Sequence, residues 1–269
     1  MEKPALLGLI AGNGVYPQMV AQRARLAGVQ RIVAAAFTSE TDPALAALVD
    51  KVEWLRAGQL GRLLKFFKSQ GVRQAIMAGQ IAPANLFDLR PDMKALLLLS
   101  RLERRNAESI FAAIAAELAD DGIILLPATT FLERELATLG LMSGRPLKRR
   151  QRADVEFGLG VAREISRLDI GQTVVVKNGS VLAVEAFEGT DAAIRRGGAL
   201  GQGGAVVVKV AKPNQDMRFD VPVVGVATVT AAAEAGVSAI ALETDRTLLL
   251  PRNETLAAAD AHGITVLGT

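Results

Sequence analysis

Acidic and basic side chains crowd into residues 185–220, which makes this segment the part of the chain best equipped for chemistry. The apolar run at 205–208 within it is typical of a buried strand. Because charged groups before and after such a strand can meet at its ends, the segment predicts a site for a metal ion and phosphates. Its carboxylates and cations are Glu185, Glu188, Asp191, Asp216, Asp220, Arg195, Arg196, Lys209, Lys212 and Arg218.

The scarcity of histidine and the absence of cysteine limit which metal ions and catalytic groups the chain can use. The chain has one histidine, His262, and no cysteine, so it cannot supply the usual ligands of a zinc site. A Ser-His-Asp triad would have to use His262, which is better explained as a helix end followed by Gly263. Acid–base and metal chemistry must then rest on Asp, Glu, Lys or Tyr. Hard oxygen ligands of this kind favour Mg²⁺ or Mn²⁺ as the cofactor.

Within the charged segment, Asp220 is the preferred metal ligand or water-orienting base. It ends a loop that follows the buried strand, and α/β proteins place their chemistry in such loops. Glu188 and Asp191 are expected to share the metal and the water with Asp220, whereas Asp216 is expected to support it or to cap a turn. Asp191 also has a simpler interpretation as a helix-start carboxylate that complements the dipole, with Thr190 as N-cap.

Cations near the buried strand suggest how phosphates would be held. Lys209, Lys212 and Gln215 follow the apolar run, and Arg195 precedes it. A single lysine at a strand end is commonly a solvated terminus, whereas two lysines with arginines nearby indicate a pyrophosphate clamp. These four residues are therefore assigned to substrate binding, together with Thr190 and Asp216.

A second candidate binding element is the turn Gly12-Asn13-Gly14, which follows an apolar strand and precedes a helix. It resembles half of a dinucleotide fingerprint, but Pro17 stands where Gly-x-Gly-x-x-Gly requires glycine, so NAD is not expected. Its amides could hold a phosphate or a uracil-ribose edge, and a simple tight turn explains the glycines equally well. Gln80, after the strand expected at 74–78, is also assigned to substrate binding.

Strands alternate with helices, which predicts an α/β fold of two domains. The N-terminal domain, residues 1–145, is expected to be Rossmann-like with a mainly parallel sheet. The C-terminal domain, residues 150–269, is expected to hold a mixed sheet with helices. The basic stretch SGRPLKRRQR at 143–152 is expected to be the linker between them. Asn178-Gly179 between two apolar runs predicts a β-hairpin, because this pair accepts the positive φ angles of a tight turn.

Composition limits the partners. The chain has 269 residues, half of them hydrophobic, and a formal net charge of +3. Its cations form no stripe and it has one Trp and one Tyr, so nucleic acid is not an expected partner. No signal-peptide pattern is present, and no segment approaches the roughly 20 apolar residues that span a bilayer. A cytoplasmic, soluble protein is expected; a peripheral contact with the inner membrane surface and a homodimer are left open.

Longer stretches resemble a known family. EAFEGTDAAIRRGG and KVAKPNQDMRFDVPVVG, with LIAGNG at the start and LDIGQTVVVKNGSVLAVEAFEGTD between, are similar to the LpxI family of UDP-2,3-diacylglucosamine pyrophosphatases. DDGIILLPATTFL and the C-terminal ALETDRTLLL extend the likeness over nearly the whole chain. The block at 169–225 is much more specific than any short motif.

The resemblance implies a hydrolase of lipid A biosynthesis whose substrate is a lipid-linked nucleotide sugar. Water would split UDP-2,3-diacylglucosamine into UMP and 2,3-diacylglucosamine 1-phosphate (lipid X). A magnesium-type cation, two domains that close around the substrate, and an essential aspartate that maps onto Asp220 are also implied. Two acyl chains require an apolar chamber, although a packed core explains apolar stretches such as 93–99 without a ligand.

Two other functions stay open from the residues alone. One is a hydrolase or transferase that acts on a soluble nucleotide sugar. The other is a non-catalytic regulator that binds nucleotides or lipids on a Rossmann-like domain. The clustered carboxylates argue against the regulator, since a pure phosphate binder gains nothing from five carboxylates near an anion.

Overall fold

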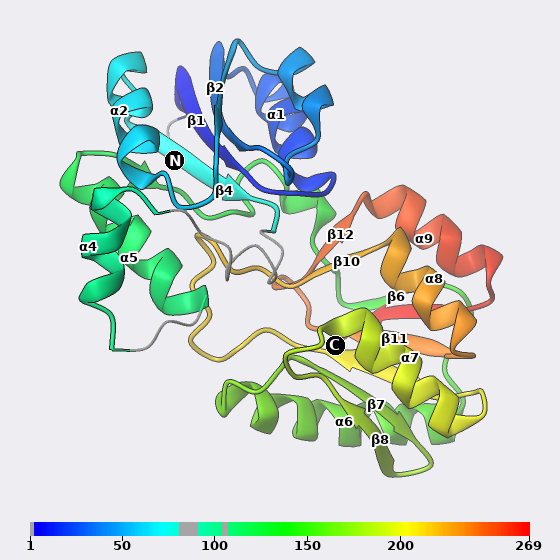
Figure 1. Ribbon diagram of the computed structural model, residues 1–269. Coiled ribbons are helices and arrows are strands. Elements are labelled where there is room, and N and C mark those ends of the chain that lie inside the picture. Colours follow the sequence, from blue (N-terminus) through cyan, green and yellow to red (C-terminus); the bar gives the residue numbers. More distant parts are fainter. Residues whose placement is uncertain (1–2, 81–90, 104–106) are drawn as a thin grey trace. The chain divides into compact units, whose positions relative to one another are not determined.

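The chain divides into two compact units in a computed structural model that describes residues 3–80, 91–103 and 107–269. Unit 1 comprises Met1–Glu133 together with Met217–Asp220, and unit 2 comprises Arg134–Asp216 together with Val221–Thr269. Each unit has its own five-stranded sheet (Figure 1), with one hydrophobic core described in unit 1 and two in unit 2. Two α/β units of this kind confirm the predicted fold class.

Unit 1 is built on a parallel sheet with the strand order β3-β2-β1-β4-β5 over its described part. The strands β1 and β2 are almost entirely buried, as expected when helices cover both faces of a parallel sheet. The order is that of a doubly wound nucleotide-binding fold, which confirms the Rossmann-like expectation. The strands are β1 (Leu6–Ala11), β2 (Arg31–Phe37), β3 (Lys51–Leu55), β4 (Gln74–Ala78) and β5 (Ile124–Leu125).

Helices cover both faces of this sheet. The helices α2 (Leu60–Gln70), α4 (Met93–Ser100) and α5 (Ala107–Asp120) pack on one face, and α1 (Tyr16–Leu26) covers the other (Figure 1). In α2, Leu60, Leu63, Leu64 and Phe67 recur at helical spacing and are buried. The helix ends before Gly71, whose φ of +75° is the left-handed cap conformation that glycine favours. Short 3₁₀ helices occupy Pro43–Ala47 and Glu133–Glu135.

Unit 2 is built on a mixed sheet with the order β13-β11-β9-β7-β8. The strand β7 is antiparallel to both of its neighbours, whereas β9, β11 and β13 are parallel, which confirms the predicted mixed sheet. Its strands are β7 (Thr173–Lys177), β8 (Ser180–Val184), β9 (Val206–Lys209), β11 (Ala239–Leu242) and β13 (Thr265–Gly268). A separate parallel pair is formed by β10 (Val223–Gly225) and β12 (Leu248–Leu250).

Alternate residues of the central strand β9 serve two cores in unit 2. Val206 and Val208 pack with the helix α6 (Arg149–Arg167), and Val207 belongs to the core shared with α7 (Thr190–Gly201). The helices α8 (Val226–Glu234) and α9 (Arg252–Ala261) extend that second core (Figure 1). A strand that packs on both faces must be apolar at every position, which is why 205–208 reads as an unbroken apolar run.

The predicted hairpin joins β7 to β8. Asn178 and Gly179 have φ angles of 52° and 74°, the positive values that a two-residue turn of this kind requires. Their amides donate to the buried carboxylate of Asp154 at 2.9 and 2.7 Å. Asp154 lies in the second turn of α6, which begins at Arg149, and it fixes the hairpin turn.

Residues 143–152, expected to be the linker, lie within unit 2. Ser143 ends the strand β6 (Gly140–Ser143), and Arg149 to Arg152 form the first turn of α6. The units instead divide between residues 133 and 134 and on either side of 217–220. Arginine and glutamine favour helices, so the basic stretch is absorbed into the helix that follows it. Of the described helices, none is long and apolar enough to cross a membrane.

Two glycines of α6 provide a test of its packing. A Cβ on Gly158 would lie 2.7 Å from Cγ2 of Val208, whereas one on the exposed Gly160 would meet nothing within 4 Å. We expect Gly158→Ala to destabilise the protein by about 1–3 kcal/mol through overpacking. Gly160→Ala should stabilise it by about 0.5–1 kcal/mol, because alanine is the better helix former. Urea unfolding of both variants checks this; equal effects would contradict the close contact between α6 and β9.

Candidate functional site

The turns that follow β1 and β4 lie side by side in unit 1. The amide of Gly12 donates to the carbonyl of Ala78 at 2.8 Å, and that of Asn13 donates to the carbonyl of Gln80 at 2.7 Å. The strand order runs outward in opposite directions from β1 and β4, and open α/β sheets bind ligands at the carboxyl ends of such a pair. The structure therefore brings the predicted residues Gly12, Asn13, Gly14 and Gln80 together at this edge.

The close approach of the two turns requires glycine at two positions. A Cβ on Gly12 would lie 2.5 Å from the carbonyl oxygen of Gln80, and one on Gly79 would lie 2.5 Å from that of Asn13. Gly79 also has a φ of +88°, which side chains rarely adopt. The Asn13 side chain donates to Glu40 at 2.9 Å, so it is already engaged. The Gly12 and Asn13 backbone amides hold the two turns together, so a backbone contact with a ligand at this edge would come from other groups of the turns.

Asp220 belongs to unit 1, although the residues on both sides of its segment belong to unit 2. The amide of Ala128 donates to the carbonyl of Met217 at 2.7 Å. The ring of Phe219 lies 5.9 Å, centroid to centroid, from that of Phe111 on α5. Because Ala128 follows β5, the segment Met217–Asp220 docks on a loop at the carboxyl edge of the parallel sheet. The attachment of Asp220 thus differs from its expected place in the C-terminal domain.

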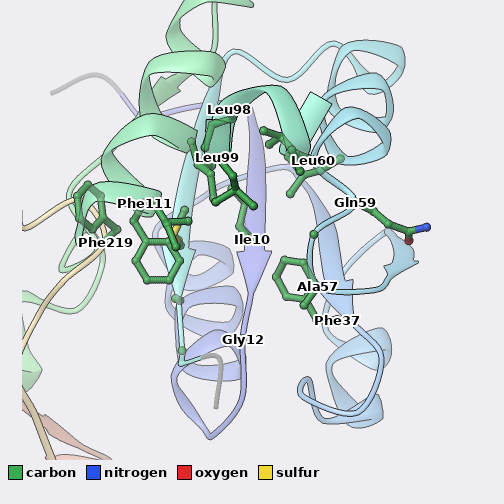
Figure 2. Close-up of a pocket in the computed structure, with 18 residues that line it drawn as sticks. Ile10, Gly12, Phe37, Ala57, Gln59, Leu60, Leu98, Leu99, Phe111 and Phe219 are labelled. Atoms are coloured by element: carbon green, nitrogen blue, oxygen red, sulfur yellow. The ribbon is translucent and has the colours of Figure 1, made fainter. Parts of the chain in front are cut away.

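An apolar pocket opens in the same unit (Figure 2). It contains about 910 Å³ of atom-free space, part of it continuous with solvent. Among the described residues that line it, Gln59 alone has a polar side chain. The lining includes Ile10, Phe37, Leu98, Leu99, Phe111 and Phe219, which Figure 2 shows around one space. Gly12 and Gly79 of the paired turns also line the pocket, so it adjoins the edge described above.

In unit 2, Lys209 is buried and does not present its ammonium to solvent. It is the last residue of β9, is 5% exposed, and donates to the hydroxyl of Thr190 at 2.7 Å and to that of Thr173 at 3.4 Å. Thr190 in turn donates to Glu185 at 2.8 Å. Lys209 and Thr190, predicted to bind substrate, are therefore brought together with Glu185, and all three side chains are engaged with one another or with Thr173.

Glu185 is ionised within this cluster. Burial is the largest single influence and raises the pKa of the Glu185 carboxyl, but the charge of Lys209 and the hydrogen bonds from Thr173, Thr190 and the amide of Gln172 together outweigh it. The net pKa is lower than the ordinary value for glutamate. The cluster thus joins β7, β9 and the start of α7, and it links a partly buried carboxylate to a buried ammonium through Thr190.

The acids at the start of α7 are arranged differently from the prediction. Gly189, not Thr190, is the N-cap, and Thr190 is the first helical residue. Asp191 lies in the first turn, where a carboxylate complements the helix dipole. Glu188 pairs with Arg196 at 2.6 Å and accepts from the amide of Ala186 at 3.1 Å. Its own backbone amide and the Arg196 guanidinium hold the Glu188 pKa below the usual range.

The remaining cations of the predicted clamp also have partners. The Nε of Arg195 lies 3.4 Å from a carboxylate oxygen of Glu234 on α8. The Arg195 guanidinium therefore pairs with α8 and does not join Lys209 in a common phosphate site. Lys212 pairs with Asp169, and its amide donates to Gln215 Oε1 at 2.7 Å. The Nε2 of the buried Gln215 has no hydrogen-bond partner among the described residues, which leaves a donor available to a ligand or water. The structure does not assemble the clamp that the sequence suggested, although Gln215 keeps a free donor.

The predicted metal ligands divide between the units. Glu188 and Asp191 belong to unit 2 and Asp220 belongs to unit 1. Across the part of the chain that the structure describes, no group of three or more His, Asp or Glu side chains could hold a metal ion. Magnesium is commonly held by one or two carboxylates together with substrate phosphates. A metal ion at Asp220 and the set of three carboxylates both stay predictions.

Sequence reasoning missed Tyr16 and Phe219. Tyr16 is buried at the start of α1 and donates to the carbonyl of Ala128 at 2.8 Å. It is the one tyrosine of the chain, and its place two residues after Gly14 was the available signal. Phe219 was also visible, as an aromatic residue inside the polar loop before Asp220. Neither residue belongs to a periodic pattern, so its packing partner was not predictable.

Comparisons with known proteins cover both units. A family model of the LpxI N-terminal domain matches residues 6–134, and one of the LpxI C-terminal domain matches residues 138–267. The chain is 36% identical over 278 positions to a UDP-2,3-diacylglucosamine pyrophosphatase LpxI of Caulobacter vibrioides. The match covers 97% of this chain and 96% of that relative. The boundary between the two family models falls where the structure first divides its units, at residues 133–134.

The buried cluster predicts a large effect of Lys209. Lys209→Met leaves the partly buried Glu185 carboxylate without its cation, so we expect a loss of about 3 kcal/mol of unfolding free energy at pH 7, the low end for a broken buried pair. Lys212→Met is the matched control: its partner Asp169 is half exposed, and we expect a loss of at most about 1 kcal/mol. Chemical denaturation measures both.

The same cluster predicts a pH dependence. In the wild type the lowered pKa of Glu185 contributes stability that is present above the ordinary glutamate pKa and is lost as pH falls through the folded value. In Lys209→Met the charge of Lys209 no longer offsets burial, so the Glu185 pKa rises relative to the wild type and protonation relieves the variant. The stability difference between the two proteins should be largest near neutral pH and shrink below about pH 4. A difference that is constant with pH would contradict the pairing.

Proposed function

The chain belongs to the LpxI family, and we propose that it hydrolyses the pyrophosphate bond of UDP-2,3-diacylglucosamine to UMP and 2,3-diacylglucosamine 1-phosphate. In its favour is the relationship to a protein of that name along nearly the full length of both chains. The structural observation that carries the proposal is the adjacency of Phe219 and Asp220. Phe219 lines the apolar pocket, and Asp220 is the next residue along the chain.

The two ends of such a substrate suit two features of unit 1. The paired turns at Gly12 and Gly79 offer backbone groups at the switch point of the sheet, where nucleotides bind in open α/β folds. The apolar pocket would receive acyl chain, because each buried methylene contributes about 0.8 kcal/mol. A soluble nucleotide sugar would leave the pocket unused, which favours the lipid-linked substrate over that alternative.

The chemistry assigned to Asp220 is to orient water and to hold a cation. Its carboxylate would accept a hydrogen bond from the attacking water at a phosphorus of the diphosphate. It would also hold a Mg²⁺ or Mn²⁺ ion jointly with the diphosphate oxygens, and a bound ion of this type neutralises the charge that builds up on them. The buried Lys209 cluster has no direct part in this proposal. Its role is structural: the hydrogen bond from Lys209 to Thr190 attaches the start of α7 to the end of β9.

Product analysis tests the reaction. Phosphorus NMR of a reaction in oxygen-18 water should show UMP and the sugar 1-phosphate, with the isotope shift on the phosphorus that was attacked. We expect Mg²⁺ to support the reaction and EDTA to abolish it. Absence of UMP from diacylated substrate with Mg²⁺ would favour a non-catalytic binding protein. Equal turnover of UDP-N-acetylglucosamine would favour the soluble-substrate alternative.

The role of Asp220 makes a separate prediction. Asp220→Asn keeps the shape of the side chain but removes its charge, so kcat should fall by at least about 10³-fold while substrate binding remains measurable. Asp121→Asn is a matched control in unit 1, because Asp121 pairs with Lys68 on the surface at 2.5 Å. It should retain near-normal kcat. A fully active Asp220→Asn enzyme would remove the assignment.

We also propose that α4 touches the membrane that carries the substrate. Met93, Leu96 and Leu97 are 72%, 48% and 53% exposed at the helical spacing of one face. The other face of α4 lines the apolar pocket through Leu98 and Leu99. In sequence, residues 90–105 hold five cations and two acids, a net charge of +3 that suits an anionic surface. An apolar face beside cations is typical of helices that lie on membranes.

Vesicle binding tests this contact. Leu96→Gln/Leu97→Gln should weaken co-sedimentation with phosphatidylglycerol-containing vesicles by at least about tenfold, because each leucine loses about 1.5–3 kcal/mol of apolar transfer free energy. Turnover of detergent-dispersed substrate should stay near normal. Leu139→Gln/Leu141→Gln, which alters two exposed leucines of unit 2, is the matched control. Equal sedimentation of the wild type and both double variants would contradict the contact.

A further inference from the structure

We propose that Tyr16 is a positioning residue that holds Asp220 in place through Ala128. The inference rests on the proposed function, because it assumes that Asp220 acts on the substrate. Tyr16 does not need to touch the substrate in this role. Its hydroxyl fixes Ala128, which binds the Asp220 segment at Met217.

The first contact in this arrangement is the buried hydroxyl of Tyr16. Tyr16 is 8% exposed, begins α1, and donates to the carbonyl of Ala128 at 2.8 Å. Burial raises the pKa of Tyr16 well above its usual value, so the hydroxyl keeps its proton throughout the neutral range. The hydrogen bond is therefore a permanent donor contact, and it does not titrate.

The second contact lies on the opposite side of Ala128. Its amide donates to the carbonyl of Met217 at 2.7 Å, and Ala128 itself is 1% exposed. The strand β5 before it is only two residues long. Turn hydrogen bonds from Thr130 to Pro127 and from Leu132 to Thr129 shape the loop, but both lie within it. Tyr16 therefore supplies a long-range anchor that connects this loop to α1.

The third contact fixes the far end of the docked segment. Phe219 packs beside Phe111 and lines the apolar pocket, and Asp220 follows it directly. The four-residue segment is thus held by a backbone hydrogen bond at Met217 and by an aromatic side chain at Phe219. A displacement of Ala128 would move the first of these two anchors, and a misplacement of about 1 Å can cost 10²-fold in rate.

Tyr16 also lies close in sequence to the turn Gly12-Asn13-Gly14. Gly14, in the turn assigned to substrate binding, stands two residues before it. The start of α1 therefore carries both the turn and the side chain that anchors the Asp220 loop. Tyr16 thus holds the turn at Gly12–Gly14 and the segment Met217–Asp220 in a constant relative position, although residues 16 and 220 are more than 200 positions apart in the sequence.

The test is Tyr16→Phe, which keeps the ring and removes the hydroxyl. We expect kcat to fall by about tenfold, with KM changed by less than about threefold, because orientation and not binding is lost. Amide hydrogen exchange should be faster at Ala128 in the variant, and this readout does not require activity. If the wild type shows no pyrophosphatase activity, the proposed function fails, whereas the exchange measurement still reports on the anchor.

Two further variants separate positioning from general stability. Ser143→Ala removes a buried hydroxyl that donates to Asp260 at 2.7 Å in unit 2, and it should lower stability without lowering kcat. Phe219→Leu loosens the other anchor of the segment. Its effect on kcat should be non-additive with that of Tyr16→Phe, because both act on the same four residues. Unchanged kcat and unchanged exchange in Tyr16→Phe would overturn the inference, as would an equal loss of kcat in Ser143→Ala.

Discussion

The segment Met217–Asp220 constrains the molecule more than any single element. Four residues from the second half of the sequence are attached to the first unit by a backbone hydrogen bond to Ala128 and by the ring of Phe219. A segment this short has little freedom once both ends are held. The chain before and after it belongs to unit 2, so unit 1 is completed by residues that its own half of the sequence does not contain.

This attachment gathers in unit 1 the features that a lipid-linked nucleotide would need. Paired glycine turns, an apolar pocket and an aspartate all belong to elements at the carboxyl edge of one parallel sheet. Each has a separate physical origin: close backbone approach for Gly12 and Gly79, apolar helix faces for the pocket, and tertiary docking for Asp220. Their combination is more informative about function than any one of them.

The charged cluster of unit 2 has a different character. Lys209 is buried, and it is connected through Thr190 to the partly buried Glu185, as is expected of ionised groups withdrawn from water. Arg195, Arg196 and Lys212 have acidic partners on the surface. Much of the charge concentration in residues 185–220 is therefore explained by pairing within unit 2, and Gln215 retains an unmatched buried donor.

Sequence by itself determined the local structure and the family. Apolar runs and the Asn178-Gly179 pair predicted β4, the hairpin and the apolar β9, because these depend on neighbours along the chain. Long stretches of likeness identified the family. Tertiary structure alone decided that α6 begins inside the expected linker, that Lys209 is buried against Glu185, and that Asp220 joins unit 1. The reason is physical: the partner of a charged or aromatic side chain is chosen by packing across large sequence separations, and neither periodicity nor residue type encodes it.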